Sequence, residues 1–117
     1  MDEFIRKQVK TDRKVTLRGA NATINAHLVD VSIKGIGVLS ERGARIGTEL
    51  DTQFELPAFS YFKTFDLHGV VTNRHNVGDE IYLHIEFSDL NKNDRLALQD
   101  FIDYKNRLSH ASTKNYN

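Results

Sequence analysis

The sequence contains no cysteine, no tryptophan and a single proline, Pro57. Without cysteine, neither a disulfide framework nor a thiolate metal site can form. No apolar run approaches the ~20 residues of a membrane-spanning helix, and the N-terminus lacks the apolar core of a signal peptide. From these absences we expect a cytoplasmic protein that does not insert into membranes.

The sequence also has no excess of positive or negative charge. Sixteen Lys and Arg residues balance sixteen Asp and Glu residues in a chain of 117 residues, which is long enough for one domain with its own core. A neutral chain has no overall field that draws it onto DNA or RNA, so we expect no nucleic-acid partner. Any binding of phosphate must come from a local patch of cations.

Motifs that would indicate catalysis are absent as well. The five histidines show no metal-ligand spacing, and Ser32 with Asp30 has no nucleophile-elbow motif around it. Gly35-x-Gly37 lacks the third glycine of a dinucleotide-binding fingerprint. We therefore expect a protein that is not an enzyme and that has no metal and no resident cofactor.

Apolar and polar residues alternate along most of the chain, which is typical of β-strands. The alternation recurs in six segments: 14–18, 24–28, 36–39, 50–56, 65–71 and 81–87. Asn76-Val77-Gly78-Asp79 is a hairpin signal before the last of them. After this segment the period becomes helical, with Asn91 or Asn93 as the cap and with apolar residues at Leu98, Phe101, Ile102 and Leu108.

This order of elements predicts an all-β fold, a small antiparallel β-barrel closed or plugged by a C-terminal helix. We divide the chain into a flexible basic arm at residues 1–13, the barrel with its helix at residues 14–108, and a disordered polar tail at residues 109–117. The division rests on where the alternation begins and where the helical spacing ends.

The segment from Asp30 to Gly35 carries the clearest chemical signal. Asp30 and Ser32 lie two residues apart on a predicted strand, so their side chains point the same way. Gly35 then permits a tight turn or the close approach of a ligand. Two interpretations remain open: a pocket for an anionic ligand that carries a nucleobase, or an Asx or Ser turn that closes a hairpin.

The basic residues near the N-terminus, including Arg6, Lys10 and Arg13, also allow two interpretations. They form either a solvated leader or an arm that folds over a bound phosphate. Arginine suits the second task because its planar guanidinium grips phosphate with two hydrogen bonds and stacks on a purine.

In this order the two motifs resemble the PilZ domain family of cyclic di-GMP (c-di-GMP) receptors. The family has a basic Arg-x-x-x-Arg segment followed by Asp/Asn-x-Ser-x-x-Gly, and the second motif is complete here in Asp30, Ser32 and Gly35. The resemblance runs from about Arg6 to Leu108. It implies a six-stranded antiparallel barrel with a C-terminal helix, and c-di-GMP as the ligand.

The first motif departs from the family pattern, because Lys10 stands where the second arginine is expected. Lysine keeps the charge but loses the two-pronged hydrogen bond and the flat stacking face. Arg13 is close enough along the chain to compensate. The resemblance thus implies a ligand-binding set of Arg6, Lys10, Arg13, Asp30, Ser32 and Gly35.

The leading hypothesis is a non-catalytic c-di-GMP receptor whose arm orders over the barrel and signals to a downstream protein, in motility, biofilm or exopolysaccharide control. The alternative is a PilZ-type adaptor that does not bind the nucleotide. In either case we expect a monomer or a weak dimer. An aromatic cluster is either a contact patch for the partner or core packing beneath a loop: Phe59, Tyr61, Phe62 and Phe65.

Overall fold

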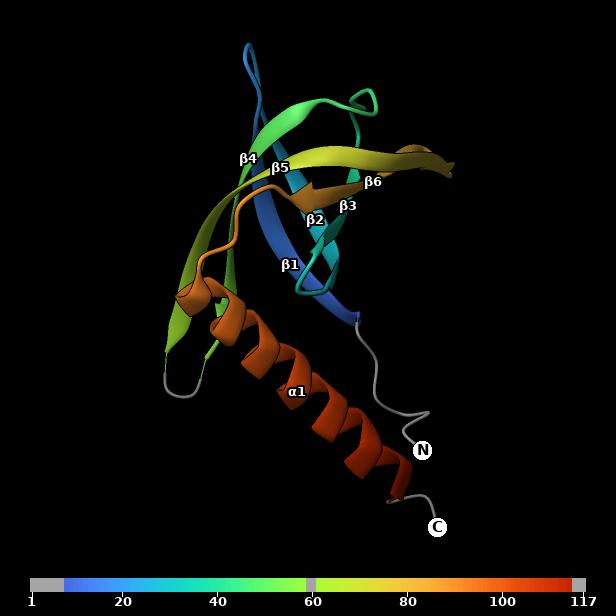
Figure 1. Cartoon of the computed structure of the whole chain (residues 1–117). Coiled ribbons are helices and arrows are strands. Elements are labelled where there is room, and N and C mark those ends of the chain that lie inside the picture. Colours follow the sequence, from blue (N-terminus) through green and yellow to red (C-terminus); the bar gives the residue numbers. More distant parts are fainter. Residues whose placement is uncertain (1–7, 59–60, 115–117) are drawn as a thin grey trace.

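The computed structural model of the chain describes residues 8–58 and 61–114. Six antiparallel strands form a closed barrel in the order β1-β2-β3-β6-β5-β4, and one helix follows them (Figure 1). The elements are β1 (Val9–Arg18), β2 (Thr23–Val31), β3 (Gly35–Ser40), β4 (Glu49–Pro57), β5 (Phe62–Val77), β6 (Glu80–Phe87) and α1 (Lys92–Lys114). The predicted fold class is confirmed.

Alternation along the strands builds the core inside the barrel. In β4 every second residue from Leu50 to Leu56 is buried, and the residues between them are exposed. β5 and β6 follow the same rule with Phe65, Leu67 and Val71, and with Leu83 and Ile85. One hydrophobic cluster therefore fills the inside of the barrel.

The helix α1 packs across one end of the barrel. Asn91 caps it, because its side-chain Oδ1 accepts a hydrogen bond from the backbone N–H of Asp94 at 2.8 Å. Leu98, Phe101 and Ile102 are buried against the core. The second half of α1 runs past the end of the barrel (Figure 1), so only the first half of the helix serves as a plug.

Two predicted boundaries need correction. β1 begins at Val9 and not after residue 13, because Val9 pairs with Val31 and is buried with it. α1 continues to Lys114, where a disordered tail was expected from residue 109, since no proline or glycine between 109 and 114 interrupts it. The rest of the predicted arm, residues 1–7, lies outside the described residues.

The predicted aromatic cluster divides between core and surface. Phe65 is buried and stacks on Phe54 at a centroid separation of 5.2 Å, whereas Tyr61 and Phe62 are 62% and 56% exposed. Phe59 lies outside the described residues. In the part of the chain that the structure describes, no helix is both long enough and apolar enough to cross a membrane.

Candidate ligand-binding site

Strands β2 and β3 bring Asp30 beside Gly37 on the outer surface of the barrel. Gly37 lies between two fully buried residues of β3, so it faces outward, and it is the register partner of Asp30. From β6, the Tyr82 hydroxyl donates a hydrogen bond to Oδ2 of Asp30 at 2.9 Å. A Cβ atom on Gly37 would lie 2.2 Å from the Tyr82 oxygen and 2.4 Å from Oδ1 of Asp30. The contact therefore depends on glycine at this position.

Asp30 is only 4% exposed, and a buried carboxylate is costly unless a donor satisfies it. Tyr82 is that donor. Burial, reinforced by the charge of Asp30, raises the pKa of the Tyr82 hydroxyl far above its usual range, so the group keeps its proton. The ring of His75 stacks on the ring of Tyr82, with their centroids 4.8 Å apart, and this contact also helps to hold the tyrosine in place. The carboxylate of Asp30 is consequently fixed in place.

Lys10 lies directly across from Asp30, as its register partner on β1. Its side chain is exposed, and within the described part of the chain it forms no ion pair. The fold thus places an exposed cation across from a buried carboxylate.

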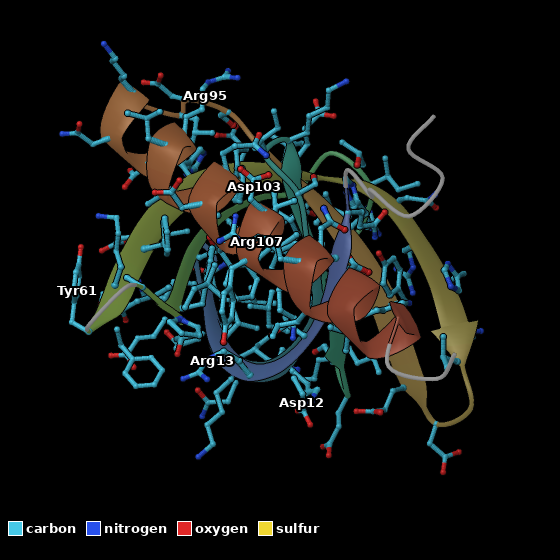
Figure 2. All side chains as sticks on the ribbon, turned by 90° about the horizontal axis from the view of Figure 1, so that it is seen from below. Asp12, Arg13, Tyr61, Arg95, Asp103 and Arg107 are labelled. Atoms are coloured by element: carbon cyan, nitrogen blue, oxygen red, sulfur yellow. The ribbon has the colours of Figure 1, made fainter. Side chains whose placement is uncertain are left out.

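Arg13 is held elsewhere. It is the register partner of Leu28, after an irregularity in β1 that follows Lys10, and its guanidinium carbon lies 4.8 Å from the centroid of the Phe62 ring. Seen from below, Arg13 lies next to Asp12 on β1 at the end of the barrel that α1 crosses (Figure 2). The structure therefore places Lys10 opposite Asp30, whereas Arg13 lies opposite Leu28.

Ser32 and Gly35 shape the turn from β2 to β3. The Ser32 hydroxyl oxygen accepts hydrogen bonds from the backbone N–H groups of Lys34 and Gly35, at 3.1 and 3.2 Å. A Cβ atom on Gly35 would lie 2.2 Å from the carbonyl oxygen of Ile85. The space beside Gly35 is thus taken by the backbone of β6, and the hydroxyl of Ser32 closes a hairpin, as the second sequence interpretation proposed.

Sequence reasoning missed Gly37 and Tyr82 as members of this site. The signals were present: Gly37 is two residues beyond Gly35, and Tyr82 is an aromatic residue on the polar face of an alternating strand. Only the pairing of β3 with β6 brings them to Asp30. Arg6, the first predicted cation, lies outside the described residues.

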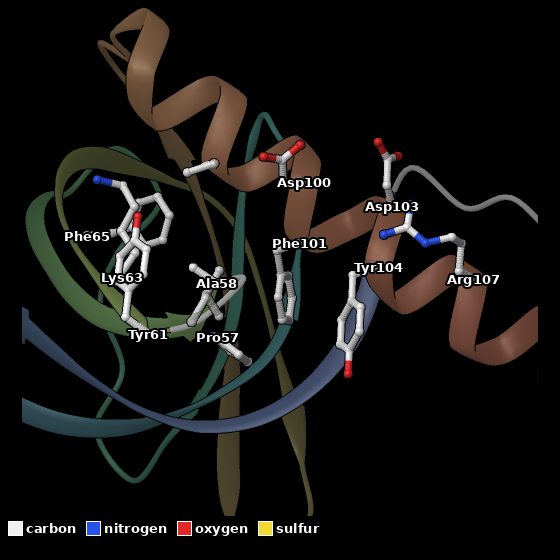
Figure 3. A pocket seen from close by; sticks show the side chains of 12 residues that line it. Pro57, Ala58, Tyr61, Lys63, Phe65, Asp100, Phe101, Asp103, Tyr104 and Arg107 are labelled. Atoms are coloured by element: carbon white, nitrogen blue, oxygen red, sulfur yellow. The ribbon is translucent and has the colours of Figure 1, made fainter.

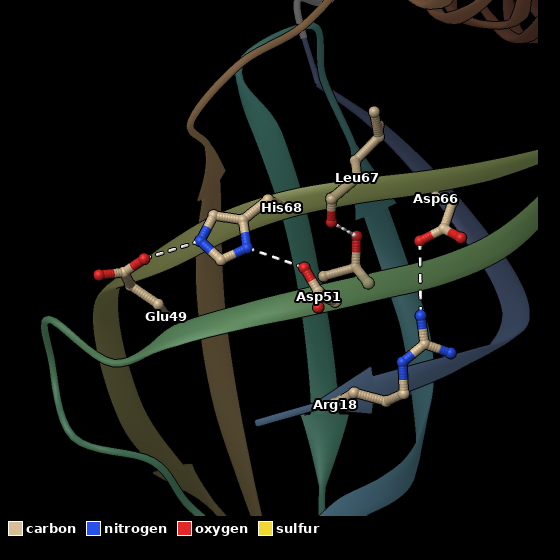
Figure 4. A network of polar contacts seen from close by, with 7 residues as sticks. Arg18, Glu49, Asp51, Asp66, Leu67 and His68 are labelled. Atoms are coloured by element: carbon tan, nitrogen blue, oxygen red, sulfur yellow. Dashed lines mark hydrogen bonds and ion pairs between the residues drawn. The ribbon is translucent and has the colours of Figure 1, made fainter. Parts of the chain in front are cut away.

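A second polar cluster lies on the outer surface of β4 and β5 (Figure 4). The two ring nitrogens of His68 contact Oδ1 of Asp51 and Oε1 of Glu49, each at 2.8 Å. The hydrogen bond to Asp51, followed by the one to Glu49, raises the pKa of His68 above its usual value. Among the described residues, no group of His, Asp and Glu side chains is arranged to hold a metal ion.

A closed six-stranded barrel with a C-terminal helix and a buried acidic residue near the end of β2 defines a class of small β-barrel domains. The sequence profile of the PilZ domain matches residues 3–104, most of the chain. This chain belongs to the PilZ domain family. None of the curated proteins matches it.

Solved structures agree with this assignment. The chain is similar to the Bacillus subtilis inhibitor of motility (MotI/DgrA), with a TM-score of 0.75 and 18% identity over 89% of this chain and 50% of that one. It is also similar to the PilZ domain of Escherichia coli YcgR with c-di-GMP, with a TM-score of 0.69 and 15% identity over 92% and 94% of the two chains.

A longer YcgR chain in complex with c-di-GMP gives a TM-score of 0.75 and 14% identity, over 96% of this chain and 50% of that one. The chain thus spans about half the length of the inhibitor of motility and of this longer YcgR. At such identities the similarity shows a shared fold.

Proposed function

We propose that the chain is a non-catalytic receptor for c-di-GMP and that the ligand binds on the outer face of β1, β2 and β3. Membership of the PilZ family supports this. So do the c-di-GMP complexes of Escherichia coli YcgR and Borreliella burgdorferi PlzA among the similar structures. The observation that carries the proposal is the placement of the exposed cation Lys10 directly across from the fixed carboxylate of Asp30.

Each group has a chemical task in this proposal. Oδ2 of Asp30 is used by Tyr82, and no described residue is hydrogen-bonded to Oδ1, which is left to accept the ring N–H or the amine of guanine. Lys10 and Arg6 bind phosphate, with Arg13 joining them if it leaves Phe62. Ser32 and Gly35 act through the turn, which sets the position of Asp30.

The signal in this proposal is the ordering of the N-terminal residues over the barrel, which creates a surface for a downstream protein. Binding shifts that equilibrium only by its preference for the ordered state. The name of the similar Bacillus subtilis protein suggests motility as one output. Hydrogen exchange tests the mechanism: the amides of the N-terminal segment slow on addition of c-di-GMP, and unchanged exchange in the presence of bound ligand contradicts it.

A second candidate is a PilZ adaptor that binds protein partners and no nucleotide. Two observations favour it: lysine stands at position 10, and Arg13 is engaged by Phe62 rather than by the Asp30 site. The exposed rings of Tyr61 and Phe62 give such an adaptor an apolar contact surface.

Calorimetric titration of c-di-GMP separates the two candidates. We expect saturable binding that Arg6→Ala and Asp30→Ala abolish. Lys10→Arg restores the family motif and strengthens binding by about tenfold, because it adds the bidentate hydrogen bond. Lys14→Ala, which removes another exposed cation of β1, is the matched control and leaves the affinity unchanged.

If the folded natural protein and the Lys10→Arg variant both give no heat of binding, the receptor proposal is contradicted and the adaptor is favoured. Absence of heat that Lys10→Arg reverses shows that the natural lysine has switched off an otherwise intact site.

A further inference from the structure

A groove separates α1 from the β4–β5 hairpin (Figure 3). Its volume is about 710 Å³, and its walls are mostly aromatic and apolar. Phe101 and Tyr104 extend from the helix on one side, and Tyr61 and Phe65 face them from the hairpin on the other. The groove lies apart from Asp30 and Lys10, and nothing in the proposed receptor site uses it.

The helical wall of the groove belongs to a longer apolar stripe. Ala97, Phe101, Tyr104 and Leu108 recur at intervals of four, three and four residues, which is the a/d spacing of a coiled coil. Phe101 is buried against the barrel, but Tyr104 and Leu108 are each 47% exposed. The stripe therefore starts in the groove and continues on the half of α1 that extends past the barrel.

Two opposite charges flank this stripe. Asp100 and Arg107 each come immediately before an a position, so both occupy g positions, where coiled coils place the charges that select partners. Both line the groove, and neither forms an ion pair within the described residues. A single helix thus carries both halves of an interhelical charge pair.

Asp100 and Arg107 can form ion pairs between two copies of α1 when the helices lie antiparallel about a two-fold axis between Phe101 and Tyr104. Leu108 of one copy then lies over the small Ala97 of the other, at the mouth of the groove. Asp100 of one copy faces Arg107 of the other, with an offset of two residues, or roughly 3 Å along the axis. Because such an interface is self-complementary, the charge pair forms twice.

We propose that the groove and the exposed stripe of α1 bind a second copy of this chain as an antiparallel helix pair. The exposed aromatic ring of Tyr61 on the hairpin then covers the second helix from the barrel side. The interface is small and joined by exposed ion pairs, so the dimer dissociates on dilution.

Charge reversal tests this proposal without disturbing the core, since both residues are exposed on the helix. Sedimentation velocity of the full chain across a wide range of concentration, without nucleotide, measures the dimer dissociation constant. We expect Asp100→Arg and Arg107→Asp each to raise that constant by at least about tenfold, because each variant brings like charges together twice. Arg95→Asp, the same change on another side of the helix, leaves it unchanged.

The decisive measurement mixes the two weakened variants. In the mixture, the arginine introduced by Asp100→Arg in one chain meets the aspartate introduced by Arg107→Asp in the other. The natural Arg107 of the first chain meets the natural Asp100 of the second, so a heterodimer forms with both pairs restored. Native mass spectrometry identifies the heterodimer by its mass.

Three outcomes overturn the proposal. The protein is monomeric at every concentration, or neither charge reversal changes the dimer dissociation constant, or the mixture of the two variants stays monomeric. In the first case a different protein is left as the occupant of the groove.

Discussion

Two clusters on the outer surface of the barrel use the same chemistry in opposite surroundings. In one, a tyrosine of β6 donates to Asp30 of β2; in the other, His68 of β5 joins Asp51 and Glu49 of β4. Asp30 is 4% exposed, whereas the side chains of Asp51 and Glu49 are 53% and 70% exposed. The Tyr82–Asp30 hydrogen bond links β6 to β2 across β3, whereas the His68 contacts join the neighbouring strands β5 and β4. Both clusters hold strands of the barrel together, and they differ most in burial.

Burial decides what each cluster does for the molecule. A buried carboxylate that loses its donor retains a large desolvation cost, while an exposed one is rehydrated by water and screened by salt. The Asp30 cluster also requires a glycine next to it, which the His68 cluster does not. We infer that the Asp30 cluster is a fixed, specific arrangement suited to recognition, and that the His68 cluster adjusts stability.

The largest effect is expected at Gly37. In Gly37→Ala the new Cβ collides with the Tyr82 and Asp30 oxygens, so the hydrogen bond breaks and the carboxylate is displaced. We expect a loss of about 2 kcal/mol or more in the free energy of unfolding, and loss of c-di-GMP binding. Urea denaturation and calorimetry measure the two effects.

Gly19→Ala is the matched control for this substitution, because a Cβ there meets Leu50 at an ordinary 3.4 Å. A Gly37→Ala protein as stable as the Gly19→Ala control would show that the Asp30 cluster adapts easily, and the contrast with the His68 cluster would fail.

A smaller effect is expected from Tyr82→Phe, which removes one hydroxyl and leaves Oδ2 of Asp30 without its donor. The cost is about 1–3 kcal/mol of stability, the usual penalty for an unsatisfied buried group. If Tyr82 also holds Asp30 for the ligand, the affinity for c-di-GMP falls by about tenfold at temperatures where the variant is folded. Tyr61→Phe, on an exposed ring, changes neither quantity. Lower stability with unchanged affinity would restrict Tyr82 to a structural role.

The sequence predicted the barrel well because alternation is a local signal. Asp30 and Ser32 were also found locally, through their motif. Tyr82 reaches Asp30 only across 52 residues of chain, through the pairing of β3 with β6, and no local pattern encodes that pairing. The start of β1 was placed too late, although the same alternation applied from Val9 would have put Lys10 and Arg13 on opposite faces of the strand.

The smallest effect is expected from His68→Gln, and its dependence on pH distinguishes the exposed cluster from the buried one. The two carboxylates raise the pKa of His68 in the folded state, so the protonated ring stabilises the fold. This contribution is complete below about pH 6.5, the ordinary pKa of histidine, and disappears as the pH rises through the raised folded value. Because the cluster is exposed, we expect His68→Gln to cost less than about 1 kcal/mol at acidic pH, less again in high salt, and nothing at alkaline pH. Denaturation midpoints of the variant and the natural protein across this range measure the effect; a cost that persists at alkaline pH would mean that the neutral ring, and not its charge, holds β4 to β5.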